Sequence, residues 1–231
     1  MFEKKYITIR CMENRLYSDE EVMNLPDISP DHTHAGEWMI RKRSCQRLIR
    51  YLTEKKKRQT ILEPGCGNGW LAHCLSEVPH TEVTGLDINF TELQQAARVF
   101  NENEHLRFIY GNLETGILRG RKFDCIVFAA SIQYFRSLKE TIRFCLHLLK
   151  PGGEIHLLDS PFYEEQEIAA AKERTFRYYD SLGYPEMSEY YFHHNINDIR
   201  GFRHRILQNP GSLFNRLWGN RDPFYWICIK K

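Results

Sequence analysis

Apolar and polar positions follow two rhythms along this chain. Between residues 59 and 158, short apolar runs alternate with longer stretches in which apolar residues recur at three- and four-residue steps. The short runs are typical of strands buried on both faces, and the longer stretches are typical of amphipathic helices. We expect strands at residues 59–62, 82–87, 106–110, 123–128 and 154–158, and helices at about 70–78, 90–100 and 138–149. Because strands alternate with helices, the sheet is expected to be mainly parallel with helices on both faces.

The pattern changes after residue 159. Residues 163–182 predict a long helix, and residues 183–197 are rich in aromatic side chains and histidines. Two final apolar runs, at 202–207 and 224–229, predict closing strands. The connection between these strands is too short for a comfortable parallel crossover, so we expect them to pair antiparallel.

The N-terminal segment has a weaker pattern. Tyr6, Ile7 and Ile9 predict a short strand. The segment at 18–34 contains Pro and Asp and predicts a loop. From 35 to 57 the apolar residues recur at helical steps, and the opposite face of that helix is basic. A solvated helix face accounts for these charges.

The composition is typical of a soluble globular chain. Of 231 residues, 42% are hydrophobic and 27% are charged, which argues against disorder, and the length suits one large α/β domain with elaborations. The net charge of +2 provides no global basic field for nucleic acid. No apolar run is long enough to span a bilayer, and the start of the sequence lacks the apolar core of a signal peptide.

The seven cysteines include no Cys-x-x-Cys pair. This pattern predicts free thiols in a reducing compartment, and hence a cytoplasmic protein without a zinc site. Two pairs of loop histidines, His32 with His34 and His193 with His194, are the remaining candidates for a metal site. Nothing in the sequence fixes the distance between the pairs, so we predict no metal.

A glycine-rich turn follows the first predicted strand. The segment from Ile61 to Trp70 has glycines at positions 65, 67 and 69, after which helical spacing begins. Glycine permits positive φ and leaves the backbone open to a ligand, and the helix start offers free N–H groups. The turn therefore predicts a site for a nucleotide-like ligand.

Two details separate this turn from a dinucleotide site. The dinucleotide fingerprint Gly-x-Gly-x-x-Gly requires glycine at position 70, where this chain has Trp70. Glu63 places an acid just before the glycines, which disfavours a pyrophosphate and favours a cationic ligand group.

Several motifs in order resemble the class I S-adenosylmethionine-dependent methyltransferases. The segment Glu63-Pro64-Gly65-Cys66-Gly67-Asn68-Gly69 is similar to the family's first motif, and Asp87 ends the second strand as the family's ribose-binding acid does. Three further segments follow in the family's order: Gly111-Asn112-Leu113, Phe123-Asp124 through Ala129-Ala130-Ser131, and Leu148-Leu149-Lys150-Pro151-Gly152-Gly153. The likeness covers roughly residues 58 to 160.

The resemblance implies an α/β, Rossmann-like fold. The sheet would be seven-stranded and mostly parallel, with helices on both faces and an antiparallel closing strand. Residues 1–57 would form an N-terminal helical cap or lid, and residues 58–231 the methyltransferase domain, with a substrate-lid insertion at about 160–200. On the cap, Trp38 and Arg41 are candidates to close over the cofactor, with Arg41 pairing with its carboxylate.

The resemblance also implies S-adenosylmethionine as the cofactor. Glu63 would hold its cationic end, directly or through water, and Asp87 would accept hydrogen bonds from its ribose hydroxyls. Asn112 stands where the family usually has an Asp beside the adenine, and its side-chain oxygen can still accept from the adenine amino group. The residues expected to contact the cofactor are Glu63, Gly65, Cys66, Gly67, Asp87, Ile88, Asn112, Leu113 and Ala129.

Candidates for the chemical step lie outside the glycine turn. Tyr134, after the fourth strand, is expected either to shape the acceptor pocket or to be a packed aromatic. His193 and His194 lie where this family builds its substrate lid, and histidine has a pKa suited to deprotonating a hydroxyl group. We take these histidines as candidate general bases, whereas His156, inside a strand, is expected to be structural.

The resemblance implies an enzyme that methylates a small-molecule acceptor, and the aromatic lid segment and modest net charge favour this function. An RNA or protein acceptor is the alternative, supported by the basic helix face with Lys55-Lys56-Lys57. A methyltransferase-like binding protein without catalysis is a third hypothesis, which the Asn at position 112 favours. We expect a monomer or homodimer that binds neither membranes nor nucleic acid.

Overall fold

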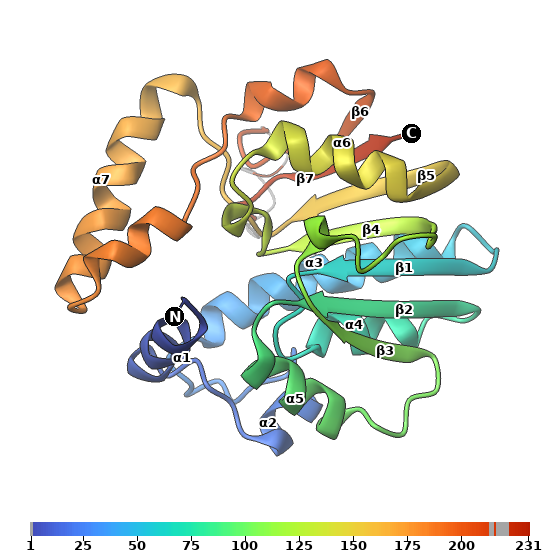
Figure 1. Ribbon diagram of the computed structural model, residues 1–231, viewed down its shortest axis with the longest axis horizontal. Helices are drawn as coiled ribbons and strands as arrows, with labels where there is room; N and C mark the ends of the chain where they lie inside the picture. Colours follow the sequence, from blue (N-terminus) through green and yellow to red (C-terminus); the bar gives the residue numbers. More distant parts are fainter. Residues whose placement is uncertain (1, 213–214, 216–221) are drawn as a thin grey trace.

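The computed structural model describes residues 2–212, 215 and 222–231, and its centre is a seven-stranded sheet in the order β3-β2-β1-β4-β5-β7-β6 (Figure 1). The strands are β1 (Gln59–Pro64), β2 (Thr81–Asp87), β3 (Leu106–Tyr110), β4 (Phe123–Ala129), β5 (Leu149–Leu158), β6 (His204–Gln208) and β7 (Trp226–Lys230). Strands β1 to β5 are parallel, and β7 is antiparallel to both neighbours, β5 and β6. The predicted fold class and the antiparallel closing pair are confirmed.

The helices between these strands lie where the apolar pattern predicts them. They are α4 (Trp70–Ser76), α5 (Phe90–Val99) and α6 (Leu138–Leu148). Asn89 caps α5 and Ser137 caps α6, because each side chain accepts from an N–H of the first turn. In the described part of the chain, no helix combines the length and apolar character needed to cross a membrane.

The sheet separates two apolar clusters, one on each face. Along β4, Cys125 and Val127 belong to one cluster, whereas Ile126 and Phe128 belong to the other, as the two-residue period of a strand requires. Helices α4 and α3 (Ala35–Thr53) contribute to the first cluster, and α6 contributes to the second. The carboxyl ends of the parallel strands therefore lie at one edge of the sheet, between two packed apolar layers.

The first segment is a helix, α1 (Phe2–Met12), so the strand predicted at Tyr6, Ile7 and Ile9 is wrong. The β-branched residues favour a strand locally, but Phe2, Tyr6 and Ile9 also stand at helical spacing. Tertiary contacts select the helix, because this spacing turns all three side chains to one face, and Ile9 is buried there.

A short helix, α2 (Asp19–Asn24), lies within the segment predicted as loop at 18–34. Ser18 and Glu21 form a capping box at its start, since each side chain accepts from the other residue's backbone N–H. The pattern Ser-x-x-Glu was available in the sequence. The helix predicted at 35–57 is confirmed as α3, although it ends earlier, at Thr53.

Helical segments fill the chain between β5 and β6. They are α7 (Glu165–Ser181) and the 3-10 segments η3 (Pro185–Tyr190) and η4 (Ile196–Gly201). Figure 1 shows α1 and α7 beyond the carboxyl ends of the parallel strands. Lys5 of α1 forms an ion pair with Glu186 of η3, and the rings of Phe2 and Tyr190 lie 4.8 Å apart. The N-terminal helix and the insertion therefore touch each other at this end of the molecule.

Candidate active site

The glycine turn between β1 and α4 holds its three glycines in the left-handed region. The angle φ is +74° at Gly65, +52° at Gly67 and +77° at Gly69. A Cβ on Gly65 would lie 2.6 Å from the Cβ of Ser131, in the loop after β4. The backbone of the turn is therefore bare where it faces the carboxyl edge of the sheet.

Gly65→Ala is expected to destabilise the protein by about 3 kcal/mol, because it combines a left-handed backbone with an overlap against Ser131. Gly116 is a matched control, since its φ is +76° and no atom lies within 4 Å of the position of an added Cβ. Gly116→Ala should cost only about 1 kcal/mol. Chemical denaturation measures both losses, and equal values would contradict the role assigned to the overlap.

A first chamber of about 400 Å³ opens at the end of β2, where Asp87 lies. Oδ2 of Asp87 accepts from the Gly67 N–H, and Oδ1 accepts from the Asn89 N–H, both at 2.7 Å. Burial raises the pKa of Asp87, while these N–H groups oppose the shift by favouring the charged form. Each oxygen keeps a lone pair, so the carboxylate can still accept from the two hydroxyls of a ribose.

The residues predicted to lie beside an adenine line the same chamber: Ile88, Asn112 and Leu113. Oδ1 of Asn112 accepts from the Glu114 N–H (2.9 Å), so this side chain caps the short 3-10 segment η1 (Leu113–Thr115). The position of Asn112 is compatible with adenine contact, and the contact itself stays a prediction.

A small hollow of about 80 Å³ adjoins the glycine turn, and Glu63, Cys66 and Ala129 line it. Glu63 is only 3% exposed, and its Oε2 has no hydrogen-bond partner within the described residues. Burial raises the pKa of Glu63 well above its usual value. A cationic group in this hollow would supply the missing partner, so these residues fit the ammonium group of a methionine-like ligand.

Trp38 and Arg41 border the small hollow from α3. Trp38 is buried, its Nε1 donates to the Tyr17 hydroxyl (2.7 Å), and its ring meets that of Trp70 edge-on at 5.2 Å. Arg41 lies over the Trp38 ring and forms an ion pair with Glu37 (2.6 Å). Trp38 is therefore both a core residue and a wall of the site, and Arg41 lies at its edge.

A third cavity, of about 450 Å³, lies among α1, α3 and α7, and we call it the tyrosine chamber. The tyrosines that line it are Tyr6, Tyr134, Tyr163, Tyr178, Tyr179 and Tyr191. Its charged residues are Arg10, Arg15, Arg41, Arg174, Glu13, Glu37 and Asp159. Tyr6 and Ala130 line all three cavities, and Tyr134 lines the first chamber and the tyrosine chamber. The cavities therefore meet at Tyr6 and Ala130, with Tyr134 beside this point.

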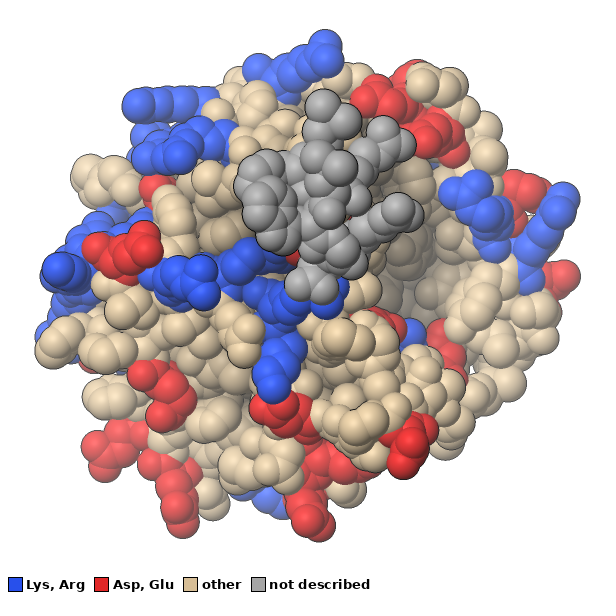
Figure 2. Space-filling model, turned by 180° about the vertical axis from the view of Figure 1, so that it is seen from behind, with Lys and Arg blue, Asp and Glu red and all other residues tan. Residues whose placement is uncertain are grey.

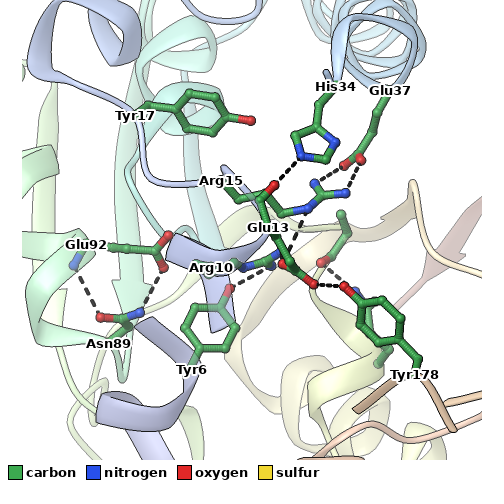
Figure 3. Close-up of polar contacts among 12 residues, drawn as sticks. Tyr6, Arg10, Glu13, Arg15, Tyr17, His34, Glu37, Asn89, Glu92 and Tyr178 are labelled. Carbon is green, nitrogen blue, oxygen red and sulfur yellow. Dashed lines mark hydrogen bonds and ion pairs between the residues drawn. The ribbon is translucent and has the colours of Figure 1, made fainter. Parts of the chain in front are cut away.

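A network of hydrogen bonds and ion pairs joins the walls of the tyrosine chamber (Figure 3). Arg10 donates to the Tyr6 hydroxyl (2.8 Å) and pairs with Glu13 (3.3 Å). Glu13 also accepts from the hydroxyl of Tyr178 on α7 and pairs with Arg15 (3.4 Å). The network fixes α1 to α7, and it leaves the Glu13 carboxylate surrounded by donors.

Glu92 on α5 is a second acid at this site, and no sequence motif marks it. It lines the first chamber and the small hollow, and its Oε2 accepts from the side-chain amide of Asn89 (2.9 Å; Figure 3). Burial, and then the charge of Asp87, raise the pKa of Glu92 to about 7. The place of Glu92 in the site becomes apparent only from the packing of α5 against the glycine turn.

Neither predicted histidine is among the residues that line these three cavities. His194 is buried, and its Nε2 lies 2.9 Å from the Ile132 carbonyl oxygen. His193 lies behind the wall of the tyrosine chamber, with Nε2 2.9 Å from Oγ1 of Thr175 and its ring 5.3 Å from that of Tyr191. Burial lowers the pKa of both imidazoles. Their role as general bases stays a prediction.

His156 belongs to a separate cluster formed by the neighbouring strands β5 and β7. Glu154, His156 and Cys228 place ligand atoms within 4.8 Å of one another. Lys55 and Lys230 both form ion pairs with Glu154, so the carboxylate already has cationic partners. Nδ1 of His156 accepts from the Trp226 indole N–H (3.0 Å), which is a structural contact inside the sheet.

Residues 1–57 were expected to form a cap, but no side chain of α1 was predicted to line the site. Phe2 lines the first chamber, Tyr6 lines all three cavities, and Arg10 lines the small hollow and the tyrosine chamber. The four-residue spacing of these side chains places them on one helix face, but the strand prediction obscured that signal. Asp159 was also missed, because a single acid after a strand has no distinctive pattern.

Residues 61–153 match a family described as "Methyltransferase domain". The chain is 25% identical to the malonyl-[acyl-carrier protein] O-methyltransferase of Halalkalibacterium halodurans, over 60% of this chain and 54% of that protein. It is 29% identical to the demethylmenaquinone methyltransferase of Thermotoga maritima, over 52% of this chain and 49% of that protein. The chain thus spans about half the length of these curated relatives.

Solved structures share the fold. The plantazolicin methyltransferase BpumL, in complex with a triazolic desmethylPZN analog and SAH, has a TM-score of 0.59 and 16% identity, over 83% of this chain and 84% of that chain. YcgJ from Bacillus subtilis has a TM-score of 0.56 and 16% identity, over 80% of this chain and 96% of that chain. At these identities the likeness concerns the fold.

Proposed function

We propose that this chain, a member of the class I S-adenosylmethionine-dependent methyltransferases, transfers a methyl group to a small-molecule acceptor. The observation that carries the proposal is the meeting of three cavities at Tyr6 and Ala130. The first chamber suits the adenosine end of the cofactor, and the small hollow suits its methionine end. The tyrosine chamber, of about 450 Å³, has the size of a small-molecule site and opens on the same point.

The residues present fit S-adenosylmethionine, which when bound supplies a methyl group on a positively charged sulfur. Asp87 would accept from the ribose hydroxyls, and Glu63 would pair with the ammonium group of the methionine end. Oε2 of Glu63 has no hydrogen-bond partner among the described residues, and this supports the assignment, because a buried carboxylate oxygen without a partner is costly. The bare backbone at Gly65 and Gly67 would lie against the cofactor.

The walls of the tyrosine chamber would position the acceptor and exclude water. Methyl transfer is an in-line displacement, so orientation of the two reactants supplies much of the acceleration. We assign residues 1–57 the role of a cap and the insertion at about 160–200 the role of a substrate lid. The contacts of Lys5 with Glu186 and of Phe2 with Tyr190 support this division.

An RNA or protein acceptor is less favoured, because ion pairs neutralise much of the basic face of α3. Arg43 and Arg47 pair with Asp222, and Lys55 pairs with Glu154. Figure 2, which views the molecule from behind, shows Lys and Arg at the upper left and in a band toward the centre with a few Asp and Glu among them, and more Asp and Glu below. A small acceptor also agrees better with a tyrosine-lined chamber. A cytoplasmic location and a monomeric or homodimeric state remain predictions.

Radiolabelled methyl transfer from S-adenosylmethionine tests the proposed function. The acceptor panel contains phenols, hydroxy acids, carboxylic acids and amines, with total RNA and a protein lysate beside them. We expect transfer to a small molecule, and the O-methyltransferases among the relatives favour an oxygen acceptor. Transfer to RNA that falls steeply with salt would instead support the alternative. Cofactor binding without transfer to any acceptor would indicate a binding protein.

A further inference from the structure

We propose that Asp159 is the general base of the tyrosine chamber, and that the acceptor is a phenol whose hydroxyl group Asp159 deprotonates. Asp159 directly follows β5 and lines the chamber. The inference rests on the proposed function, because it needs a bound methyl donor. It adds to that function the chemical class of the acceptor and the residue that activates it.

Asp159 lies beside the point where the three cavities meet. The carbonyl of the preceding residue, Leu158, accepts a hydrogen bond from the Ala130 N–H (3.0 Å), and Ala130 lines all three cavities. Asp159 has a φ of +53° and Ala130 a φ of +51°, in a region that non-glycine residues rarely adopt. Backbone strain of this kind persists where the surrounding structure enforces it, and it clusters at functional sites.

A buried hydrogen-bond relay holds the segment that carries Asp159 against the loop after β4. Oγ of Ser160 donates to Oε1 of Gln133 (2.9 Å), and Nε2 of Gln133 donates to the Ala130 carbonyl (2.7 Å). Ser160 and Gln133 are both buried. The relay therefore fixes the position of Asp159 relative to the point where a methyl group would be presented.

Among the described residues, one side chain donates a hydrogen bond to the Asp159 carboxylate, and it reaches one oxygen. Ser44 on α3 donates to Oδ1 at 2.6 Å. Within the described part of the chain, no group donates to Oδ2 and no cation forms an ion pair with the carboxylate. General-base catalysis requires a base that a third group orients and that keeps one lone pair for the substrate. Ser44 supplies the orientation, and Oδ2 accepts from no described residue, so it keeps its lone pairs for the substrate.

Cations near Asp159 are engaged by other acids. Arg47 pairs with Asp222, and Arg41 pairs with Glu37 at 2.6 Å. Burial consequently dominates the environment of Asp159 and raises its pKa to about 6. The group is ionised near neutral pH, yet it is a stronger base than an exposed carboxylate.

The other carboxylates of the chamber are already engaged by cations. Glu13 is paired with Arg10 and Arg15, and Glu37 is paired with Arg15 and Arg41. Burial opposes ionisation of Glu37, but its arginine partners lower the pKa of this carboxyl group to about 2, so Glu37 is a poor base.

The walls of the chamber favour an aromatic acceptor. Tyrosine rings line it from α1, from the loop after β4 and from the α7 insertion, and aromatic pairs add to the energy of apolar burial. The pKa of a phenol lies near 10, so it is neutral at physiological pH and needs a base before it attacks. A carboxylic acid would already be ionised, and an aliphatic alcohol is too weak an acid for a carboxylate base. A phenol therefore fits both the aromatic walls of the chamber and the strength of Asp159 as a base.

The chemical step is balanced without a further reactant. The acceptor's O–H proton moves to Oδ2 of Asp159 as the acceptor oxygen forms a bond to the methyl carbon. The bond from that carbon to sulfur breaks, its electron pair stays on sulfur, and the sulfur becomes neutral. The proton then passes from Asp159 to water, and the product is an aryl methyl ether.

The test compares Asp159→Asn with the wild-type protein on two phenols, 4-methylphenol and 4-nitrophenol, at about pH 8. The first is neutral under these conditions, and the second is mostly ionised. Asp159→Asn should slow methylation of 4-methylphenol at least about a hundredfold, but that of 4-nitrophenol less than about fivefold, because only the first needs a base. Asp180→Asn, at an exposed position of α7, is the control and should leave both rates unchanged. Calorimetry with SAH should give equal affinity for wild type and Asp159→Asn.

Several results would overturn the assignment. Equal losses with both phenols, or full activity of Asp159→Asn on 4-methylphenol, would exclude Asp159 as the base. A His193→Ala protein that is inactive while Asp159→Asn is active would assign the base to histidine. A wild-type protein that binds SAH but methylates no phenol would exclude the acceptor class. Failure of the wild-type protein to bind SAH would overturn the proposed function itself.

The pH profile provides a second measurement. For 4-methylphenol, kcat/KM of the wild-type protein should rise with pH through about 6, where Asp159 loses its proton. That rise should be missing from Asp159→Asn, and its presence there would contradict the proposal. The charged groups nearest the carboxylate are Arg41 and Arg47 of α3 and Asp222 before β7, and Arg10 of α1 and Arg174 of α7 line the same chamber.

Discussion

Asp87→Asn is expected to weaken the binding of S-adenosylmethionine at least about a hundredfold, which corresponds to about 3 kcal/mol. The substitution removes the charge and replaces one of two acceptor oxygens by a donor. One oxygen of Asp87 already accepts from the Gly67 N–H of the glycine turn, and the other accepts from Asn89. The variant therefore loses contacts with the ribose and also loosens the turn beside it.

Titration calorimetry with S-adenosylmethionine and SAH measures this loss. Glu82→Gln is the control, because Glu82 lies on the same strand but pairs with Arg58 and Arg107 at its other end. Its affinity for the cofactor should match that of the wild type. Undiminished affinity of Asp87→Asn would show that the cofactor does not bind at the end of β2.

Glu63→Gln should weaken cofactor binding by about thirtyfold or more and at the same time stabilise the ligand-free protein at pH 8. In the ligand-free protein, Glu63 is a buried carboxylate whose Oε2 has no partner in the described structure. Glutamine keeps the shape and removes the charge, so the burial penalty disappears. The same substitution removes the charge that would pair with the ammonium group of the cofactor.

The sign of the pH effect follows from the raised pKa of Glu63. Burial raises this pKa above its usual value of 4.5. Protonation therefore stabilises the folded state, and this stability is lost as the pH rises from about 4.5 through the raised pKa. Glu92, with a pKa of about 7, also makes the folded state less stable as the pH rises. Because Glu92 is present in both proteins, the effect of Glu63 is the difference in pH dependence between Glu63→Gln and the wild type.

Thermal unfolding without ligand from pH 5 to pH 8 measures this difference. The melting temperature of Glu63→Gln should fall less with rising pH than that of the wild type, while calorimetry shows the weaker cofactor binding. A variant that is less stable at pH 8 and binds the cofactor normally would exclude Glu63 as the partner of the ammonium group.

The cofactor half of the site can be predicted from local sequence. Its residues lie in short contiguous motifs at the ends of consecutive strands, and Gly65, Gly67 and Asp87 keep this arrangement in three dimensions. Parallel strands place their carboxyl ends at one edge, so predicting the strands also predicts which residues gather there.

The proposed acceptor half of the site cannot be predicted in the same way. Tyr6 lies on a helix that was predicted as a strand because of its β-branched residues. Asp159 lies in no recognisable sequence motif. His193 and His194 were predicted from the chemistry of their side chains. In the structure, Nε2 of His193 lies against Oγ1 of Thr175 and Nε2 of His194 against the Ile132 carbonyl oxygen, and neither residue lines the chamber. Residue type and loop position predict roughly where a residue lies relative to the site, whereas the orientation of its side chain depends on packing.

The sequence by itself determined the order of strands and helices, the glycine turn and the acids at Glu63 and Asp87, because these depend on local periodicity and on short motifs. Only the tertiary structure brought Tyr6, Ala130 and Asp159 together around a single point. These residues are far apart in the chain, and they meet because α1 and α7 close over the carboxyl edge of the sheet (Figure 1). Long-range packing therefore shapes the proposed acceptor site, while local sequence shapes the proposed cofactor site.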